Sequence, residues 1–167
     1  MRHAIESHLD SHHVARVTYG AIIGLAMIVA LEDHPPSAGV VAATLLGTAV
    51  AVALAELYSD LLGTETRMRR HVREAELRHV THDTAAVALG IGFPVVFFVL
   101  AAAEVLDEST AFTIAKWSGV GLIAFYGLAA ARLAGDGWTA SVLRALAAGL
   151  IGAFLIGLKA FVHAFSG

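Results

Sequence analysis

The amino-acid sequence predicts an all-α integral membrane protein with five transmembrane helices, and two observations carry this prediction. Of the 167 residues, 57% are hydrophobic and only 15% are charged, which is far from the balance of a soluble domain. Apolar runs of about 18 residues or more, long enough to cross a bilayer as helix, follow one another along the chain. The lipid bilayer is therefore its expected environment.

The first two spans are bounded by prolines and charged residues. We expect the first over residues 14–31, because Pro35 and Pro36 shortly after it cannot extend a helix. The second, over residues 38–62, carries Glu56 and Asp60 near its end. An ionisable group in a span costs at least about 2.5 kcal/mol at mid-bilayer and is retained mainly where it meets water, a partner or an ion. Glu56 is therefore a candidate ion-pathway residue, with a simple interfacial carboxylate as the alternative interpretation.

Residues 63–83 are hydrophilic and are expected to form a short cytoplasmic helical extension between the second and third spans. Acidic and basic side chains alternate here at a spacing of four, as in Glu65 with Arg69 and Glu74 with Arg78, which suits a helix. The remaining spans are expected over residues 84–106, 110–134 and 139–165. Pro94 predicts a kink in the third span, because it removes a helical hydrogen bond.

Basic residues near the span ends predict the orientation. Arg2 precedes the first span and Arg16 lies in its first turn, five arginines occur in residues 63–83, and Arg132 and Arg144 flank the turn at residues 135–137, whereas the loops around Asp33 and Asp107 are acidic. We expect the amino terminus to be cytoplasmic and the carboxyl terminus outside, in the plasma membrane of a prokaryote. The formal net charge of −3 gives no reason to expect nucleic acid as a partner.

Histidines and carboxylates on the expected cytoplasmic side form two candidate metal-binding patterns. His8 and His12 are four residues apart, which is one turn if the amino-terminal segment is helical. Glu76-x-x-His79 has the spacing by which helical bundles present a carboxylate and an imidazole to iron or manganese. A solvated, salt-bridged helix is the alternative interpretation of each pattern. The candidate ligands are Glu65, Glu76, His79, His82, Asp83, His8 and His12.

Four motifs together resemble the vacuolar iron transporter family, whose members export ferrous iron or manganese from the cytoplasm. They are Arg-Val-Thr-Tyr-Gly-Ala-Ile-Ile-Gly-Leu at 16–25, Ala-Glu-Leu-Tyr-Ser at 55–59, the Gly- and Pro-containing stretch at 88–94 and the basic, Gly-rich turn at 131–138. The resemblance implies five spans, a homodimer with the ion path between protomers, and a role for Glu56. The spacing Gly20-x-x-x-Gly24 in the first motif permits close approach of two helices, including helices of two subunits.

Two features depart from that family. It usually has an acid directly before the Gly-Leu of the first motif, where this chain has Ile23. Its cytoplasmic region between the second and third helices is longer and rich in Glu, whereas residues 63–83 here are rich in Arg.

The function expected from these features is outward transport of a divalent transition metal of the iron or manganese class, with Zn and Co as further cargo candidates and protons as the exchanged ion. One alternative is a non-transporting dimeric membrane module that binds metal, lipid or a partner at its cytoplasmic face. Another is a membrane di-iron hydroxylase, because His8-x-x-x-His12-His13 resembles a His box. The second histidine cluster lacks the paired His-His of those enzymes, so we do not expect an enzyme.

Overall fold

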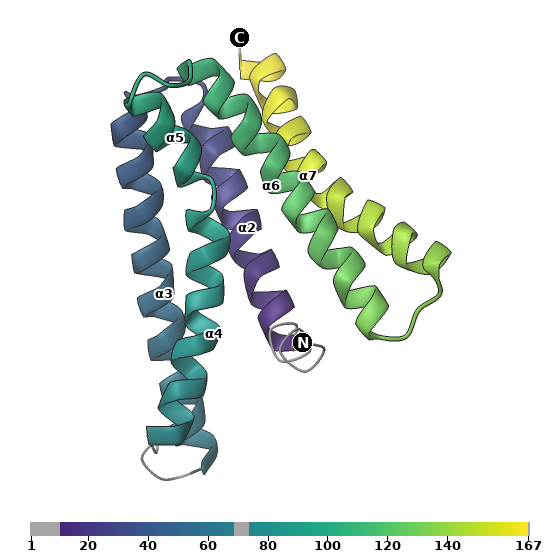
Figure 1. The fold of residues 1–167 in the computed structure, drawn as a ribbon. Coiled ribbons are helices and arrows are strands. Elements are labelled where there is room, and N and C mark those ends of the chain that lie inside the picture. Colours follow the sequence, from purple (N-terminus) through teal and green to yellow (C-terminus); the bar gives the residue numbers. More distant parts are fainter. Residues whose placement is uncertain (1–10, 69–73, 167) are drawn as a thin grey trace.

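The structure is a computed structural model that describes residues 11–68 and 74–166, and its regular elements within these ranges are all helices (Figure 1). In chain order they are α2 (Ser11–Leu31), α3 (Ala38–Met68), α4 (Glu74–Gly92), α5 (Val95–Ala102), α6 (Glu108–Leu133) and α7 (Trp138–Ser166). The all-α class predicted by the sequence is confirmed.

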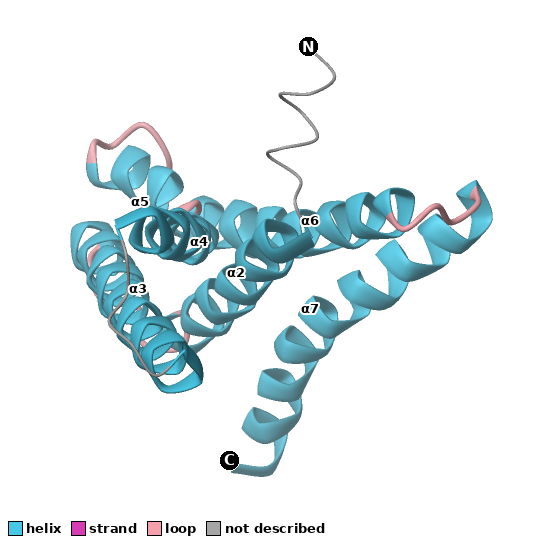
Figure 2. Ribbon diagram, turned by 90° about the horizontal axis from the view of Figure 1, so that it is seen from below, coloured by secondary structure: helices cyan, strands magenta, loops and turns pink. Residues whose placement is uncertain are grey.

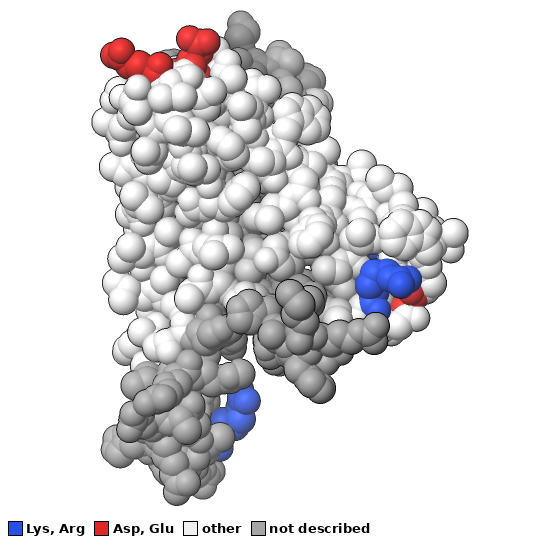
Figure 3. All heavy atoms as spheres, viewed as in Figure 1, with Lys and Arg blue, Asp and Glu red and all other residues white. Residues whose placement is uncertain are grey.

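Four of these helices, α2, α3, α6 and α7, are each long and apolar enough to cross a membrane. The pair α4 and α5 meets the same test together and is bent by 42°, so the described chain has up to five spans if the bent pair counts as one. Figure 3 shows acidic side chains at one end of the visible face, basic side chains with an acidic neighbour toward the other, and an uncharged surface between them. These features fit an all-α membrane protein.

The break between α4 and α5 lies at Pro94, where the sequence predicts a kink. Proline has no backbone N–H to donate and its ring crowds the preceding turn, so α4 ends at Gly92 and α5 begins at Val95. The short α5 packs against α3 and α6, and its Phe98 meets Phe112 of α6 edge to face with ring centroids 4.9 Å apart. The bend thus places α5 over the core of one end of the bundle.

The centre of the fold is α2, which lies between α4 and α6 (Figure 2). Gly20 and Gly90 let α2 and α4 cross closely, because a Cβ on Gly20 would overlap the carbonyl oxygen of Val87 and one on Gly90 that of Val17. A Cβ on Gly24 would meet the Ile91 backbone at 3.2 Å. The Gly20-x-x-x-Gly24 face therefore packs against α4 of the same chain.

Polar contacts tie the helices together at the end where α5 meets α6. The Glu108 carboxylate accepts a hydrogen bond from the backbone N–H of Ala38 at 2.9 Å and so satisfies one of the donors at the start of α3 that have no partner within the helix. Lys116 of α6 forms an ion pair with Glu32 at 2.6 Å, just after α2. These contacts fix the positions of α2, α3 and α6 relative to one another along the bundle axis.

Candidate functional site

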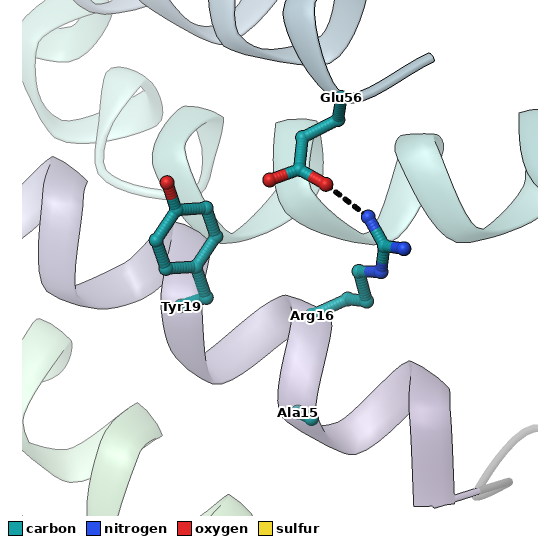
Figure 4. Close-up of a pocket in the computed structure, with 4 residues that line it drawn as sticks. All are labelled: Ala15, Arg16, Tyr19 and Glu56. Atoms are coloured by element: carbon teal, nitrogen blue, oxygen red, sulfur yellow. Dashed lines mark hydrogen bonds and ion pairs between the residues drawn. The ribbon is translucent and has the colours of Figure 1, made fainter. Parts of the chain in front are cut away.

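Glu56, the ion-pathway residue predicted from the sequence, faces α2 and forms an ion pair with Arg16 (Figure 4). Nη1 of Arg16 donates to Oε2 of Glu56, and Nη2 donates to Oδ2 of Asp60 at 2.6 Å. Glu56 and Asp60 are four residues apart in α3, which places them one turn apart on the same face. One planar guanidinium therefore holds two carboxylates.

The three side chains are partly buried, with exposed fractions of 21% for Arg16, 25% for Glu56 and 30% for Asp60. Partial burial strengthens their mutual attraction relative to a fully exposed pair, and the described chain leaves part of each side chain uncovered. Two carboxylates and one guanidinium give the cluster a formal charge of −1. The site is therefore still attractive to a cation.

An open cavity of about 270 Å³ reaches Arg16 and Glu56 of this cluster, and its lining residues are Ala15, Arg16, Tyr19 and Glu56. Tyr19 and Arg16 project from the same side of α2 toward Glu56 (Figure 4), as their spacing of three residues requires. The phenol oxygen of Tyr19 adds a neutral donor and acceptor beside the charged groups. Carboxylate and phenol oxygens are hard ligands of the kind that manganese and similar divalent cations accept.

The other candidate ligands are not brought together with Glu56. Glu65 lies nine residues further along α3, about 13 Å along the helix axis, on the part of α3 that extends past the predicted span. Residues 76, 79, 82 and 83 belong to the first half of α4, where the predicted helix is present, but the side chains of Glu76, His79, His82 and Asp83 lie outside what the structure describes.

The amino-terminal histidine pattern falls largely outside the described residues. His8 precedes the described chain, and His12 lies in the first turn of α2 with its side chain outside the description. Where side chains are described, no three His, Cys, Asp or Glu residues gather closely enough to hold a metal ion. The metal-binding role of both patterns stays a prediction.

The sequence interpretation missed Arg16 and Tyr19 as site residues and did not commit to Asp60. The spacing of Glu56 and Asp60 by one turn within a span was the signal that pointed to a shared partner. Arg16 was read only as a marker of orientation, although an arginine at the start of one span and two acids at the end of the next lie at the same membrane depth.

Ile23, at the position where the resembled family has an acid, is partly buried between helices. It packs against the cluster of Ala49 from α3 with Val87 and Ile91 from α4. An apolar side chain suits these neighbours, whereas a carboxylate there would need a polar partner. The α2 sequence contains no Asp or Glu, and Glu56 and Asp60 are the α3 acids that bond Arg16 of α2.

No known protein family, curated protein or solved structure matches this chain in the comparisons.

Proposed function

We propose that the chain is a membrane transporter that moves divalent transition-metal ions of the iron or manganese class from the cytoplasm outward. One observation carries the proposal: Glu56 and Asp60, one turn apart in an apolar helix, share the single guanidinium of Arg16 at an open cavity. Carboxylates in a membrane helix are costly and are retained mainly where they serve an ion, water or a partner.

In this mechanism Arg16 acts as a tethered cation that an incoming metal ion replaces. The arriving ion binds the carboxylate oxygens of Glu56 and Asp60, and the guanidinium of Arg16 moves toward the open side of the cavity. When the metal leaves, Arg16 returns and re-forms both ion pairs. The carboxylates are then never left together without a counter-charge, which lowers the cost of the empty state.

The oxygen ligands of this site are compatible with the harder divalent metal ions, manganese among them. Carboxylate and phenol oxygens suit the harder divalent ions, while the chain has no cysteine to select soft ions by thiolate. Transport also requires binding that is strong enough for entry and weak enough for release, and two carboxylates completed by water meet this demand better than a closed cage. The resemblance of residues 16–25 and 55–59 to the vacuolar iron transporter family supports the same class of cargo.

The proposed route begins at the end of the bundle where α2 begins and α3 ends, and leads to the end where Glu32, Asp33 and His34 lie. Carboxylates bind either a metal ion or protons, so a higher proton concentration outside favours release there. Proton exchange is therefore the coupling we propose, in a homodimer in the plasma membrane of a prokaryote.

The test is a flux assay with the full chain reconstituted into vesicles that hold a metal-quenched fluorescent chelator. We expect Mn²⁺ or Fe²⁺ to enter the vesicles faster than in protein-free vesicles, and a proton gradient in the exchange direction to raise the rate. Flux equal to that of protein-free vesicles, with the protein still helical by circular dichroism, would remove the transporter proposal.

The same ion pairs favour a second candidate, a non-transporting dimeric membrane module. A guanidinium that bonds two turns of a neighbouring helix is also a good structural clasp between α2 and α3. Under this alternative, replacing Arg16 lowers stability and changes no metal binding, because no metal competes for the carboxylates.

A further inference from the structure

A second group of charged side chains lies in the connection between α6 and α7, away from the Glu56 cavity. Here α6 ends in a Schellman motif: Gly135 has φ of +83°, its N–H donates to the carbonyl of Arg132, and the N–H of Asp136 donates to that of Ala131. The motif turns the chain sharply, so the last turn of α6 and the first turns of α7 lie side by side. The turn therefore brings arginines from both helices to one corner.

Arg132 and Arg144 are fixed at this corner by Trp138 and Asp136. The guanidinium carbon of Arg132 lies 5.7 Å from the ring centre of Trp138, and its Nη1 donates to the carbonyl oxygen of Asp136 at 3.3 Å. Nε of Arg144 lies 3.0 Å from Oδ2 of Asp136, and the Arg144 side chain is 61% exposed. Two guanidiniums against one carboxylate leave the corner with a formal charge of +1.

An apolar cavity adjoins this charged corner. Its volume is about 440 Å³, and it is lined by Trp138, Thr139, Val142 and Leu143 along one side of the first turns of α7. Figure 3 shows basic side chains beside an acidic one at the corner of the α6–α7 hairpin, next to an uncharged surface. A positive rim beside an apolar slot, at the end of two membrane-length helices, matches a molecule with an anionic head and a hydrocarbon tail.

We propose that this corner is a binding site for an anionic phospholipid. The phosphate lies on Arg132 and Arg144, whose guanidiniums retain N–H donors beyond those used by Asp136 and suit a phosphate better than an ammonium would. The first N–H groups of α7, which have no partner within the helix, and its positive dipole end favour the same anion. One acyl chain lies along Trp138, Val142 and Leu143 in the apolar cavity.

Charge decides between anionic and zwitterionic lipids at this site. A phosphatidylcholine carries a quaternary ammonium that the guanidiniums repel, whereas phosphatidylglycerol presents the phosphate alone. Each arginine near an anionic lipid surface is worth about five-fold in relative affinity, and Asp136 cancels one of the two charges. We therefore expect about a five-fold preference for phosphatidylglycerol over phosphatidylcholine. This site stands whether or not the chain transports metal.

The test uses Trp138 as the reporter. Trp117→Phe leaves Trp138 as the sole tryptophan, because the chain has two. This protein is reconstituted into phosphatidylcholine vesicles that contain equal small fractions of either brominated phosphatidylglycerol or brominated phosphatidylcholine, and bromine quenches tryptophan only in close contact. We expect several-fold stronger quenching by the brominated phosphatidylglycerol. Equal quenching by the two lipids would overturn the proposal.

Two further experiments test which residues form the site and which ligand they bind. The quenching ratio is the quenching by brominated phosphatidylglycerol divided by that by brominated phosphatidylcholine. Adding Arg132→Gln and Arg144→Gln should bring this ratio close to one, whereas Arg67→Gln at the end of α3 should leave it unchanged. An unchanged ratio in the double variant also overturns the proposal. If the double variant does not fold, the exposed Arg144→Gln alone should lower the ratio. Inorganic phosphate should not reduce the ratio more than chloride of equal ionic strength, and a phosphate-specific loss would identify free phosphate as the ligand instead.

Discussion

Nη2 of Arg16 lies 2.6 Å from Oδ2 of Asp60 while Nη1 bonds Glu56, so one side chain of α2 joins two successive turns of α3. The arrangement is asymmetric. Removing either acid leaves Arg16 paired with the other, whereas removing Arg16 leaves two carboxylates one turn apart without their counter-charge. Variants at these positions therefore separate a transport site from a structural clasp.

Glu56→Gln should lower metal flux at least about tenfold, because the amide keeps the shape of the side chain but loses a charge that offsets desolvation of a divalent ion. Folding should survive, since Arg16 keeps its bond to Asp60. The measurement is Mn²⁺ uptake by reconstituted vesicles, with helix content compared by circular dichroism.

The matched control in the same helix is Thr44→Ala, whose hydroxyl donates only to the backbone carbonyl of Val40 at 2.7 Å. This variant should transport at the wild-type rate. Wild-type flux in Glu56→Gln would show that Glu56 is an interfacial carboxylate and not part of the path.

Arg16→Gln should tighten binding of Mn²⁺ at least about tenfold, about 1.4 kcal/mol, because the metal no longer has to displace a guanidinium from Glu56 and Asp60. The same variant should transport more slowly, since release loses the returning guanidinium. Binding is measured by calorimetry in detergent, and flux in vesicles. A loss of thermal stability with no change in metal affinity would favour the structural clasp.

The helices of this chain were predictable because membrane-length apolar runs bounded by Pro, Gly and charge dominate the sequence. The kink at Pro94 followed from the missing N–H of proline. Hydropathy did not indicate that α3 continues to Met68, because helix beyond the apolar run depends on contacts between helices and on pairs of charged residues. The relative positions of α4 and α5 likewise depend on how they pack on α3 and α6, which hydropathy does not predict.

The site was predictable only in part. Glu56 stood out because an acid in an apolar run has an energetic cost, but its partner lies 40 residues away in the sequence. Single-sequence periodicity assigns faces to helices and does not say which faces meet. The spacing of Gly20 and Gly24 predicted a close contact with another helix. It did not identify that helix, which the structure shows to be α4 with Gly90.

Gly20→Ala should destabilise the protein by about 1–3 kcal/mol, because the added methyl meets backbone atoms of Val87 that cannot move without shifting α4. Gly47→Ala in α3 is the matched control, since nothing lies within 4 Å of a Cβ there, and it should be neutral or stabilising. Thermal unfolding in detergent, followed by circular dichroism, compares the two. Equal stability of both variants would contradict the close crossing of α2 and α4.

Single cysteines should report the orientation without further engineering, because the chain has no cysteine of its own. Ser37→Cys and Ser109→Cys, both exposed at the end where α5 meets α6, should react with a membrane-impermeant maleimide on intact cells. Thr66→Cys, exposed near the end of α3, should react only after the membrane is opened. The opposite labelling pattern would reverse the predicted topology.

The last prediction concerns Glu76 and His79, which stand three residues apart within the continuous helix α4 and therefore on one side of it. If both bind metal, Glu76→Gln combined with His79→Ala should weaken binding of Mn²⁺ or Fe²⁺ more than tenfold, about 1.4 kcal/mol or more. Affinity should also fall as the pH drops, because protons compete with the metal for the imidazole. The control is Arg67→Ala, which removes an exposed charge whose surface contacts are worth about 0–1 kcal/mol and should leave metal affinity unchanged. Calorimetry measures the metal affinity of each variant. Equal effects of the double variant and the control on that affinity would show that Glu76 and His79 act only through helix stability. The salt-bridged helix would then be the better account of this segment.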